Sequence, residues 1–221
     1  MLLPELREIV CKCNRILPEK DLVKMTSGNV SGRDPGSGLI VIKPSGVAFE
    51  ELQPEQMVIV DLDGHVVEGD LKPSTDTDTH LYVYARRDDV FGIVHTHSVY
   101  ASTFAVLGEP IPTCLTTCAM LGGEVPLGGY APIGGEDIGQ EIIEKIGRAK
   151  AIIMQNHGVF TIGRSAQEAT KMAVEVEEIA KITYLALARG NPIRLTEEEV
   201  DYMVDLYENR YGQRSSLSMD Q

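Results

Sequence analysis

Short apolar runs of β type alternate along the chain with segments of helical spacing, and this alternation restricts the fold more than any other feature. The β-type runs cover residues 39–42, 56–62, 65–68, 91–95, 149–154 and 159–162. The helical patterns cover residues 6–16, 76–87, 99–107, 137–146, 165–188 and 197–210. Glycine-rich stretches such as Gly122 to Gly135, and a hairpin turn at Asp63-Gly64, interrupt any regular β-α-β order. The pattern predicts one α/β domain with a mixed or antiparallel sheet.

The composition excludes several functional classes. The 221 residues contain 20 Lys and Arg against 33 Asp and Glu, a formal charge of −13 at pH 7. This charge repels nucleic-acid phosphates and anionic membranes, so neither is an expected partner. No apolar run approaches the roughly 20 residues that span a bilayer, and the first residues lack the apolar stretch of a signal peptide. With four cysteines in no clear metal-binding arrangement, we expect a reduced, cytoplasmic protein.

Two of the five histidines stand in the segment GIVHTHS, at the end of an apolar run. Alternate residues of a strand face the same side, so His95 and His97 are predicted to project together, with Thr96 facing away. A third histidine, His157, follows another apolar run in the tripeptide NHG, where Gly158 is expected to let the backbone turn sharply. Core packing, a pH switch and an acid/base pair are alternatives. Three imidazoles from two strands favour a catalytic metal, because zinc is commonly held by three histidines with a position open for substrate.

The two remaining histidines are not assigned to this site. His65 adjoins the predicted hairpin turn and is expected to be exposed. His80 lies in a helical pattern, where a packing or surface role is more common than metal ligation.

Three short segments combine hydroxyl or amide side chains with glycine or proline: SGN at 27–29, PSG at 44–46 and PST at 73–75. The first lies within residues 26–38, which are so rich in turn formers that we expect a connection there. Each segment alone is typical of a plain turn. Near the histidines, together, they can present N–H and O–H donors to an oxyanion, so we expect a phosphate cradle.

The motifs GNVSG, KPSG, KPSTD, HTHS, NHG and YGQ occur in the order and spacing of the class II aldolase/epimerase family, which the chain resembles from about residue 6 to residue 213. The resemblance implies a three-layer α/β/α domain with a central, mainly antiparallel sheet over residues 1–213, then a polar tail over 214–221. It implies a divalent ion, usually Zn²⁺ and otherwise Mn²⁺ or Co²⁺, with the ligands Asp76, His95, His97 and His157. The implied phosphate- and substrate-binding residues are Gly28, Asn29, Ser45, Gly46, Ser74 and Thr75.

The same resemblance implies a phosphorylated ketose as substrate and a cyclic homotetramer with active sites at subunit interfaces. Tyr211 matches a tyrosine that serves the neighbouring subunit's site as an acid/base, and Asp76 matches an acidic residue of the catalytic metal site. A metal that acts as a Lewis acid on the ketose carbonyl and the adjacent hydroxyl allows the C–C bond beyond them to break. An aldolase releases the aldehyde fragment, whereas a 4-epimerase turns the fragment and re-forms the bond on its other face.

Several residues favour an epimerase most like L-ribulose-5-phosphate 4-epimerase, which forms D-xylulose 5-phosphate. Asp76 replaces the glutamate that aldolases of the family generally carry, and Lys43 in VIKPSG fits the epimerase pattern. One departure is the loop LTTCAMLGGE, which lacks the epimerase's aspartate. Met120 and Thr116 stand near that place, and Glu124 is the nearest carboxylate.

The alternative to the epimerase is a class II aldolase like L-fuculose-1-phosphate aldolase, which releases dihydroxyacetone phosphate and an aldehyde. The non-catalytic head of adducin shares the fold, but such a module is expected to lack the three histidines. A decarboxylase of sugar-acid phosphates needs an additional cation near the motifs, and the sequence offers no basic cluster there.

Overall fold

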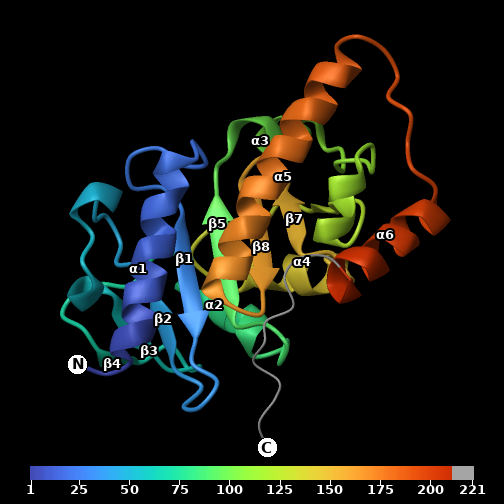
Figure 1. Cartoon of the computed structure of the whole chain (residues 1–221). Coiled ribbons are helices and arrows are strands. Elements are labelled where there is room, and N and C mark those ends of the chain that lie inside the picture. The colour runs from blue at the N-terminus through green and yellow to red at the C-terminus, as the bar shows by residue number, and fades with distance from the viewer. Residues whose placement is uncertain (211–221) are drawn as a thin grey trace, which may run out of the picture.

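The structure is a computed structural model that describes residues 1–210 (Figure 1). The α-helices are α1 (Pro4–Glu19), α2 (Thr77–Tyr84), α3 (Val99–Leu107), α4 (Asp137–Lys145), α5 (Ala166–Leu187) and α6 (Glu197–Asn209). The strands are β1 (Asn29–Arg33), β2 (Ile40–Ile42), β3 (Val58–Val60), β4 (Val66–Glu68), β5 (Gly92–Thr96), β6 (Leu127–Gly128), β7 (Ala151–Met154) and β8 (Gly158–Gly163). Short 3₁₀ turns are η1 (Phe49–Glu51), η2 (Pro54–Gln56) and η3 (Thr116–Leu121).

All eight strands form one sheet in the order β4-β3-β2-β1-β5-β8-β7-β6. Neighbouring strands pair antiparallel, except that the two-residue strand β6 runs parallel to β7. The sheet is therefore mixed and mainly antiparallel, as predicted. In the centre of the sheet, the pairing of β1, β5 and β8 places His95 opposite Asn29 on one side and Phe160 on the other.

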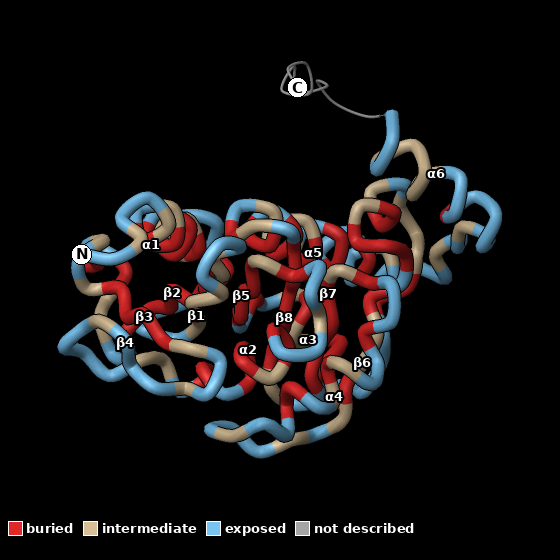
Figure 2. The backbone as a smooth tube through the Cα atoms, turned by 90° about the horizontal axis from the view of Figure 1, so that it is seen from below, coloured by how far each residue is buried: buried red, intermediate tan, exposed pale blue. Residues whose placement is uncertain are grey.

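Helices cover both faces of the sheet and give the expected three layers (Figure 1). Strand β2 shows how the faces separate: Ile40 and Ile42 pack in the core under α2 and α4, whereas Val41 packs under α1 and α5. Helix α3 and turn η3 extend the second face. Burial of each such side chain stabilises the fold by about 1.5–3 kcal/mol. Figure 2 shows the consequence: the central strands are buried between helices whose outer sides remain exposed.

Strand β1 corrects the prediction that residues 26–38 are a connection. Asn29–Arg33 forms an inner strand between β2 and β5 despite its serine and glycine content. Two neighbours that both offer ladder hydrogen bonds outweigh a weak local preference. Gly32 also has a packing reason, because a Cβ atom there would lie 2.9 Å from a methyl carbon of Val10 in α1.

Residues 211–221 lie outside the described residues, and with them Tyr211, the predicted domain boundary at 213 and the tail 214–221. Within residues 1–210, no helix combines the length and the apolar character that crossing a bilayer requires. The predicted hairpin is present as β3 and β4, and the glycine-rich stretch 122–135 contains only β6 as regular strand.

Candidate active site

His95 is fixed by the centre of the sheet. Its side chain is almost fully buried, and its ring stacks on Phe160 of β8 with the ring centroids 4.2 Å apart. The Nδ1 atom lies 3.0 Å from the carbonyl oxygen of Val159, which can only accept a hydrogen bond. Nδ1 therefore carries the proton, and the lone pair of Nε2 faces the other two histidines. This is the support that metal-binding histidines commonly have, because it fixes both tautomer and ring orientation.

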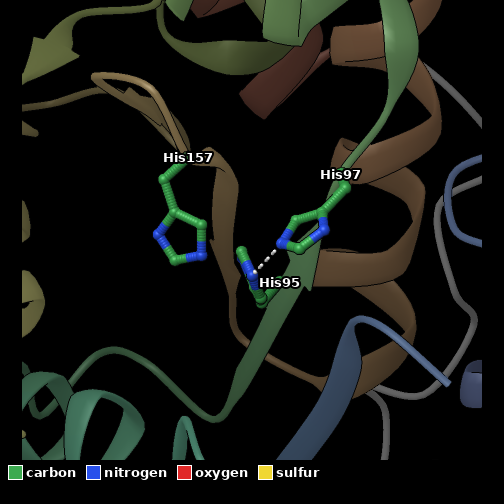
Figure 3. Close-up of side chains that lie close together, drawn as sticks. All are labelled: His95, His97 and His157. Carbon is green, nitrogen blue, oxygen red and sulfur yellow. Dashed lines mark hydrogen bonds between the residues drawn. The ribbon is translucent and has the colours of Figure 1, made fainter. Parts of the chain in front are cut away.

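His97 lies just beyond the end of β5, since the strand stops at Thr96. It nevertheless meets the other two histidines, as Figure 3 shows. Its Nε2 atom is 2.9 Å from Nε2 of His95, and its ring centroid is 5.3 Å from that of His157. The rings of His95 and His157 are 4.7 Å apart. The predicted convergence of the three imidazoles is present.

The three-residue turn between β7 and β8 carries His157. The turn is closed by the backbone N–H of His157, which donates to the carbonyl of Met154 at 3.0 Å. Asn156, at φ 57°, takes the left-handed conformation, and Gly158 does not, so the prediction that Gly158 makes the turn is wrong. Gly158 is needed for close approach, because a Cβ atom there would collide with the carbonyl oxygen of Thr96.

The donor set fits a divalent ion. One ligand atom from each histidine lies within 4.8 Å of the others, and two nitrogens on a tetrahedral zinc stand about 3.3 Å apart. Nδ1 of His157 is buried and has no partner among residues 1–210. Burial lowers the pKa of His95 to about 3 and also lowers the pKa of His97 and of His157. All three imidazoles are thus neutral at pH 7, the form that binds a metal.

Asp76, immediately before α2, lines the same cavity but does not belong to the group of three histidines. Nδ2 of Asn29 donates to its carboxylate at 2.6 Å and to Oγ of Ser74 at 3.0 Å. Burial raises the pKa of Asp76, but His95, His80 and the hydrogen bond from Asn29 outweigh burial and lower it. The carboxylate is therefore ionised, and its role as a fourth ligand stays a prediction.

A cavity of about 290 Å³ opens in front of these side chains. The structure brings all six predicted substrate-binding residues to its wall, and their contact with a phosphate stays a prediction. Polar backbone and hydroxyl groups dominate the lining, which is Thr26, Ser27, Gly28, Asn29, Lys43, Pro44, Ser45, Gly46, Ser74, Thr75, Asp76, His95, His97, Ile133 and His157.

Lys43 is the charged residue of this cavity to which the sequence pattern gave no role in the site. Its side chain is 2% exposed, and Nζ donates to the carbonyl oxygens of Thr26 and Pro44 at 3.4 and 3.3 Å. Nζ also lies 4.7 Å from the ring centroid of Phe49. No carboxylate among residues 1–210 pairs with it, and burial lowers the pKa of Lys43 to about 8. The available signal was its place directly after the apolar run 39–42.

The loop at residues 115–124, which lacks the aspartate expected of an epimerase, lies away from this cavity. Thr116, Met120 and Glu124 are absent from its lining. Glu124 instead lines a separate cavity of about 350 Å³ beside Arg148 and α6. None of the three reaches this cavity from within its own chain, and Tyr211 lies outside the described residues.

The sequence model of a known family, described as "Class II Aldolase and Adducin N-terminal domain", matches residues 8–184. The chain belongs to this family. It is 35% identical over 214 residues to 5-deoxy-D-ribulose 1-phosphate aldolase of Bacillus thuringiensis serovar kurstaki, a match that covers 97% of this chain and 100% of that protein. These findings support an enzyme of the class II aldolase type.

Solved structures of class II aldolase relatives match the fold. An L-fuculose 1-phosphate aldolase superposes with a TM-score of 0.89 at 33% identity, covering 92% of this chain and 96% of the other. YgbL of Escherichia coli, a putative aldolase/epimerase/decarboxylase, superposes with a TM-score of 0.81 at 26% identity, covering 92% of this chain and 100% of the other. The predicted family and fold class are confirmed.

Proposed function

We propose that this chain is a divalent-metal-dependent aldolase that cleaves a ketose 1-phosphate into dihydroxyacetone phosphate and an aldehyde. The observation that carries the proposal is the convergence of three neutral imidazoles on one wall of a cavity lined with hydroxyl and amide groups. Two similar proteins are named as aldolases of 5-deoxy-D-ribulose 1-phosphate and L-fuculose 1-phosphate. This support leads us to prefer the aldolase over the epimerase that the motifs favoured.

His95, His97 and His157 would hold the ion, which we propose is Zn²⁺. Such an ion, when bound, would supply Lewis-acid catalysis at the carbonyl and adjacent hydroxyl of the ketose, so that the C–C bond beyond them can break. The ring of His95 is fixed by its contact with the carbonyl of Val159, and the β7–β8 turn fixes the backbone of His157. The site then needs groups that bind the phosphate and move protons.

The phosphate lies, in this proposal, against the hydroxyl and backbone donors of segments 27–29, 44–46 and 74–75. Their N–H and O–H groups suit an oxyanion in a protein whose overall charge is −13. Lys43 supplies the positive charge, since it is buried at the cavity wall without a carboxylate partner among the described residues. Desolvation strengthens its attraction for a phosphate dianion.

Cleavage requires that a base take the proton of the hydroxyl on the departing carbon and that an acid protonate the carbon of the retained fragment. We assign these proton transfers to Tyr211 and Asp76. Asp76 is held in place by Asn29, whose amide bridges it to Ser74. Tyr211 acts in the site of a neighbouring subunit in a homotetramer. Exposed apolar side chains on α3 and at the end of α5, among them Val99, Leu107 and Leu185, support such an assembly.

A second candidate is a 4-epimerase that acts on L-ribulose 5-phosphate. The short carboxylate of Asp76 favours it, because aldolases of the family generally carry glutamate at this place. The lining of the cavity argues against it, since Asp76 is the only carboxylate that residues 1–210 contribute there.

The test uses the full-length protein loaded with Zn²⁺ and three substrates: 5-deoxy-D-ribulose 1-phosphate, L-fuculose 1-phosphate and L-ribulose 5-phosphate. Dihydroxyacetone phosphate, detected by coupled reduction with NADH, is the expected product from the 1-phosphates. D-xylulose 5-phosphate from L-ribulose 5-phosphate, with no free fragments, would establish the epimerase instead. A fully loaded enzyme that converts none of them would refute both.

Tyr211→Phe tests the acid/base assignment separately. Loss of the hydroxyl should lower kcat by about 10²-fold, the usual contribution of a general acid or base. The variant should keep the metal content and assembly of the wild type, measured by metal analysis and by light scattering. An unchanged kcat would remove Tyr211 from the mechanism.

A further inference from the structure

The helix α3 starts two residues after His97, and its first backbone N–H groups have no carbonyl partners within the helix. A serine stands at the N-cap position, where its hydroxyl normally accepts a hydrogen bond from the second or third helical N–H. Ser98 makes no such bond, and its buried Oγ has no partner within residues 1–210. The cap must come from elsewhere.

Glu177, in the middle of α5, supplies it. Oε1 accepts from the backbone N–H of Tyr100 at 2.9 Å, and Oε2 accepts from that of Ala101 at 3.0 Å. Each carboxylate oxygen thus satisfies one orphaned donor, although the partners are 76 and 77 residues apart. A carboxylate at a helix N-terminus also interacts favourably with the helix dipole.

Helix α5 is a firm support for this carboxylate. Val176 and Ile179, which flank Glu177 along the helix, are buried in one apolar cluster with Ala101 of α3. The ring of Tyr100 packs edge-on against Tyr184, with 5.6 Å between the centroids. The start of α3 is therefore clamped to α5 by both backbone and side-chain contacts.

The three histidines differ in how they are held. His95 is locked by the stacking on Phe160 and by the carbonyl of Val159, and His157 sits in a hydrogen-bonded turn. His97 is exposed, lies outside the strand, and among residues 1–210 its only recorded hydrogen bond joins it to His95. Its position thus depends on its backbone.

We infer that Glu177 is a positioning residue for His97: by capping α3 from α5 it fixes residues 97–99 and so the direction of this imidazole. The inference rests on the metal site of the proposed function. Outer groups that orient a metal ligand typically contribute 10- to 100-fold to metal affinity. Glu177 contacts neither the cavity nor the histidines, so any effect must pass through the backbone.

The experiment titrates Co²⁺ or Zn²⁺ into metal-free full-length protein and measures affinity by visible absorption or by competition with a chromophoric chelator. Glu177→Ala should weaken binding by about 10- to 100-fold. Glu177→Gln should fall between Ala and the wild type, because its amide oxygen accepts only one of the two bonds. Glu178→Ala is the charge-matched control on an exposed neighbour, and Ser165→Ala is a control that removes the cap of α5. Both should bind metal as the wild type does.

Hydrogen exchange in the metal-free proteins gives a second readout. The amides of Tyr100 and Ala101 should exchange faster in Glu177→Ala than in Glu178→Ala. Faster exchange with unchanged metal affinity would show that Glu177 is only a structural cap, and would overturn the inference while leaving the proposed function intact. A wild type that binds no divalent ion would instead remove the metal site and, with it, the role of Glu177.

Discussion

Two regions of the molecule bring histidine together with other potential metal ligands, and they differ in how those ligands are used. His95, His97 and His157 meet at the ends of the central strands. Asp61, Asp63 and His65 meet in the turn between β3 and β4, and their ligand atoms also lie within 4.8 Å of one another. Closeness alone does not separate the two groups.

Both carboxylate oxygens of Asp61 in this turn already have partners. Oδ1 of Asp61 accepts from the backbone N–H of Asp63 at 3.0 Å and from that of His65 at 2.9 Å, and its other oxygen lies 3.2 Å from Nδ1 of His65. The side chains of Asp61 and His65 are 36% and 78% exposed. In the central cluster, by contrast, a buried nitrogen of His157 has no partner among the described residues. A binding site is marked by fixed lone pairs that the fold leaves unused.

The largest expected effect comes from His97→Ala compared with His65→Ala. His97→Ala should abolish activity and stoichiometric metal binding, because one of three ligands is lost, and should leave the fold intact, because the side chain is exposed. His65→Ala should retain both. Metal analysis, circular dichroism and the aldolase assay measure these outcomes. Full metal content in His97→Ala, or its loss in His65→Ala, would reverse the comparison.

Lys43→Met removes the buried cation beside the central cluster while keeping an apolar side chain against Phe49. Loss of a charge-assisted bond to phosphate costs about 1.5–3 kcal/mol, so kcat/KM should fall by about 10- to 100-fold, mainly through KM. Lys24→Met is the matched control, since Lys24 is exposed and pairs with Asp21. Equal kinetics in the two variants would show that Lys43 does not bind the substrate.

A pH effect is expected from His80, which is fully buried in the core and whose Nδ1 atom lies 2.7 Å from Oγ of Ser31. Burial lowers its pKa from 6.5 to about 4. The unfolded chain therefore takes up this proton first, and stability is lost as pH falls from about 6.5 towards 4. Each such histidine contributes a slope of about 1.4 kcal/mol per pH unit within that window.

Urea unfolding of the metal-free protein between pH 7 and pH 5 measures the slope. His95 contributes in a similar window, because burial lowers its pKa too. His80→Gln should therefore reduce the slope without removing it. An identical slope in the variant would exclude His80 as a source.

The smallest expected effect is on stability, from substitutions in the turn between β3 and β4. Asp61→Ala removes the acceptor of two backbone N–H groups at a partly exposed position, and should lower the free energy of unfolding by about 0.5–1.5 kcal/mol. Asp63→Ala, whose carboxylate has no recorded hydrogen bond, should change it less. Metal affinity and activity should be unchanged in both. A decrease in metal affinity in either variant would give the turn a role that we exclude.

The fold and much of the site follow from local patterns. Apolar runs, the Asp-Gly turn and helical spacing correctly predict the β3–β4 hairpin, the long helix α5, the strand that carries His95 and the strand that precedes His157. The meeting of the histidines was predictable because each follows a buried run, and two such runs tend to lie in the same sheet. Direct pairing of β5 with β8 brings them together.

The features that were missed depend on distant parts of the chain. Strand β1 is defined by its neighbours, and its own serine and glycine residues indicate a turn. The burial of Lys43 depends on Phe49 and on the carbonyl group of Thr26, which belongs to a different loop. The orientation of Glu124 away from the histidines depends on where η3 packs. None of these has a periodic signal.

Two glycines enclose the strand that carries His95. A side chain at Gly28 would reach within 2.8 Å of the carbonyl oxygen of His95, and one at Gly158 would collide with that of Thr96. The backbone that carries His95 can therefore hardly shift as the sequence diverges, whereas an exposed position at the cavity rim such as Ile133 is free to vary. Natural evolution, or laboratory selection for a new sugar substrate, would retain the backbone around His95 and vary the exposed residues at the cavity rim.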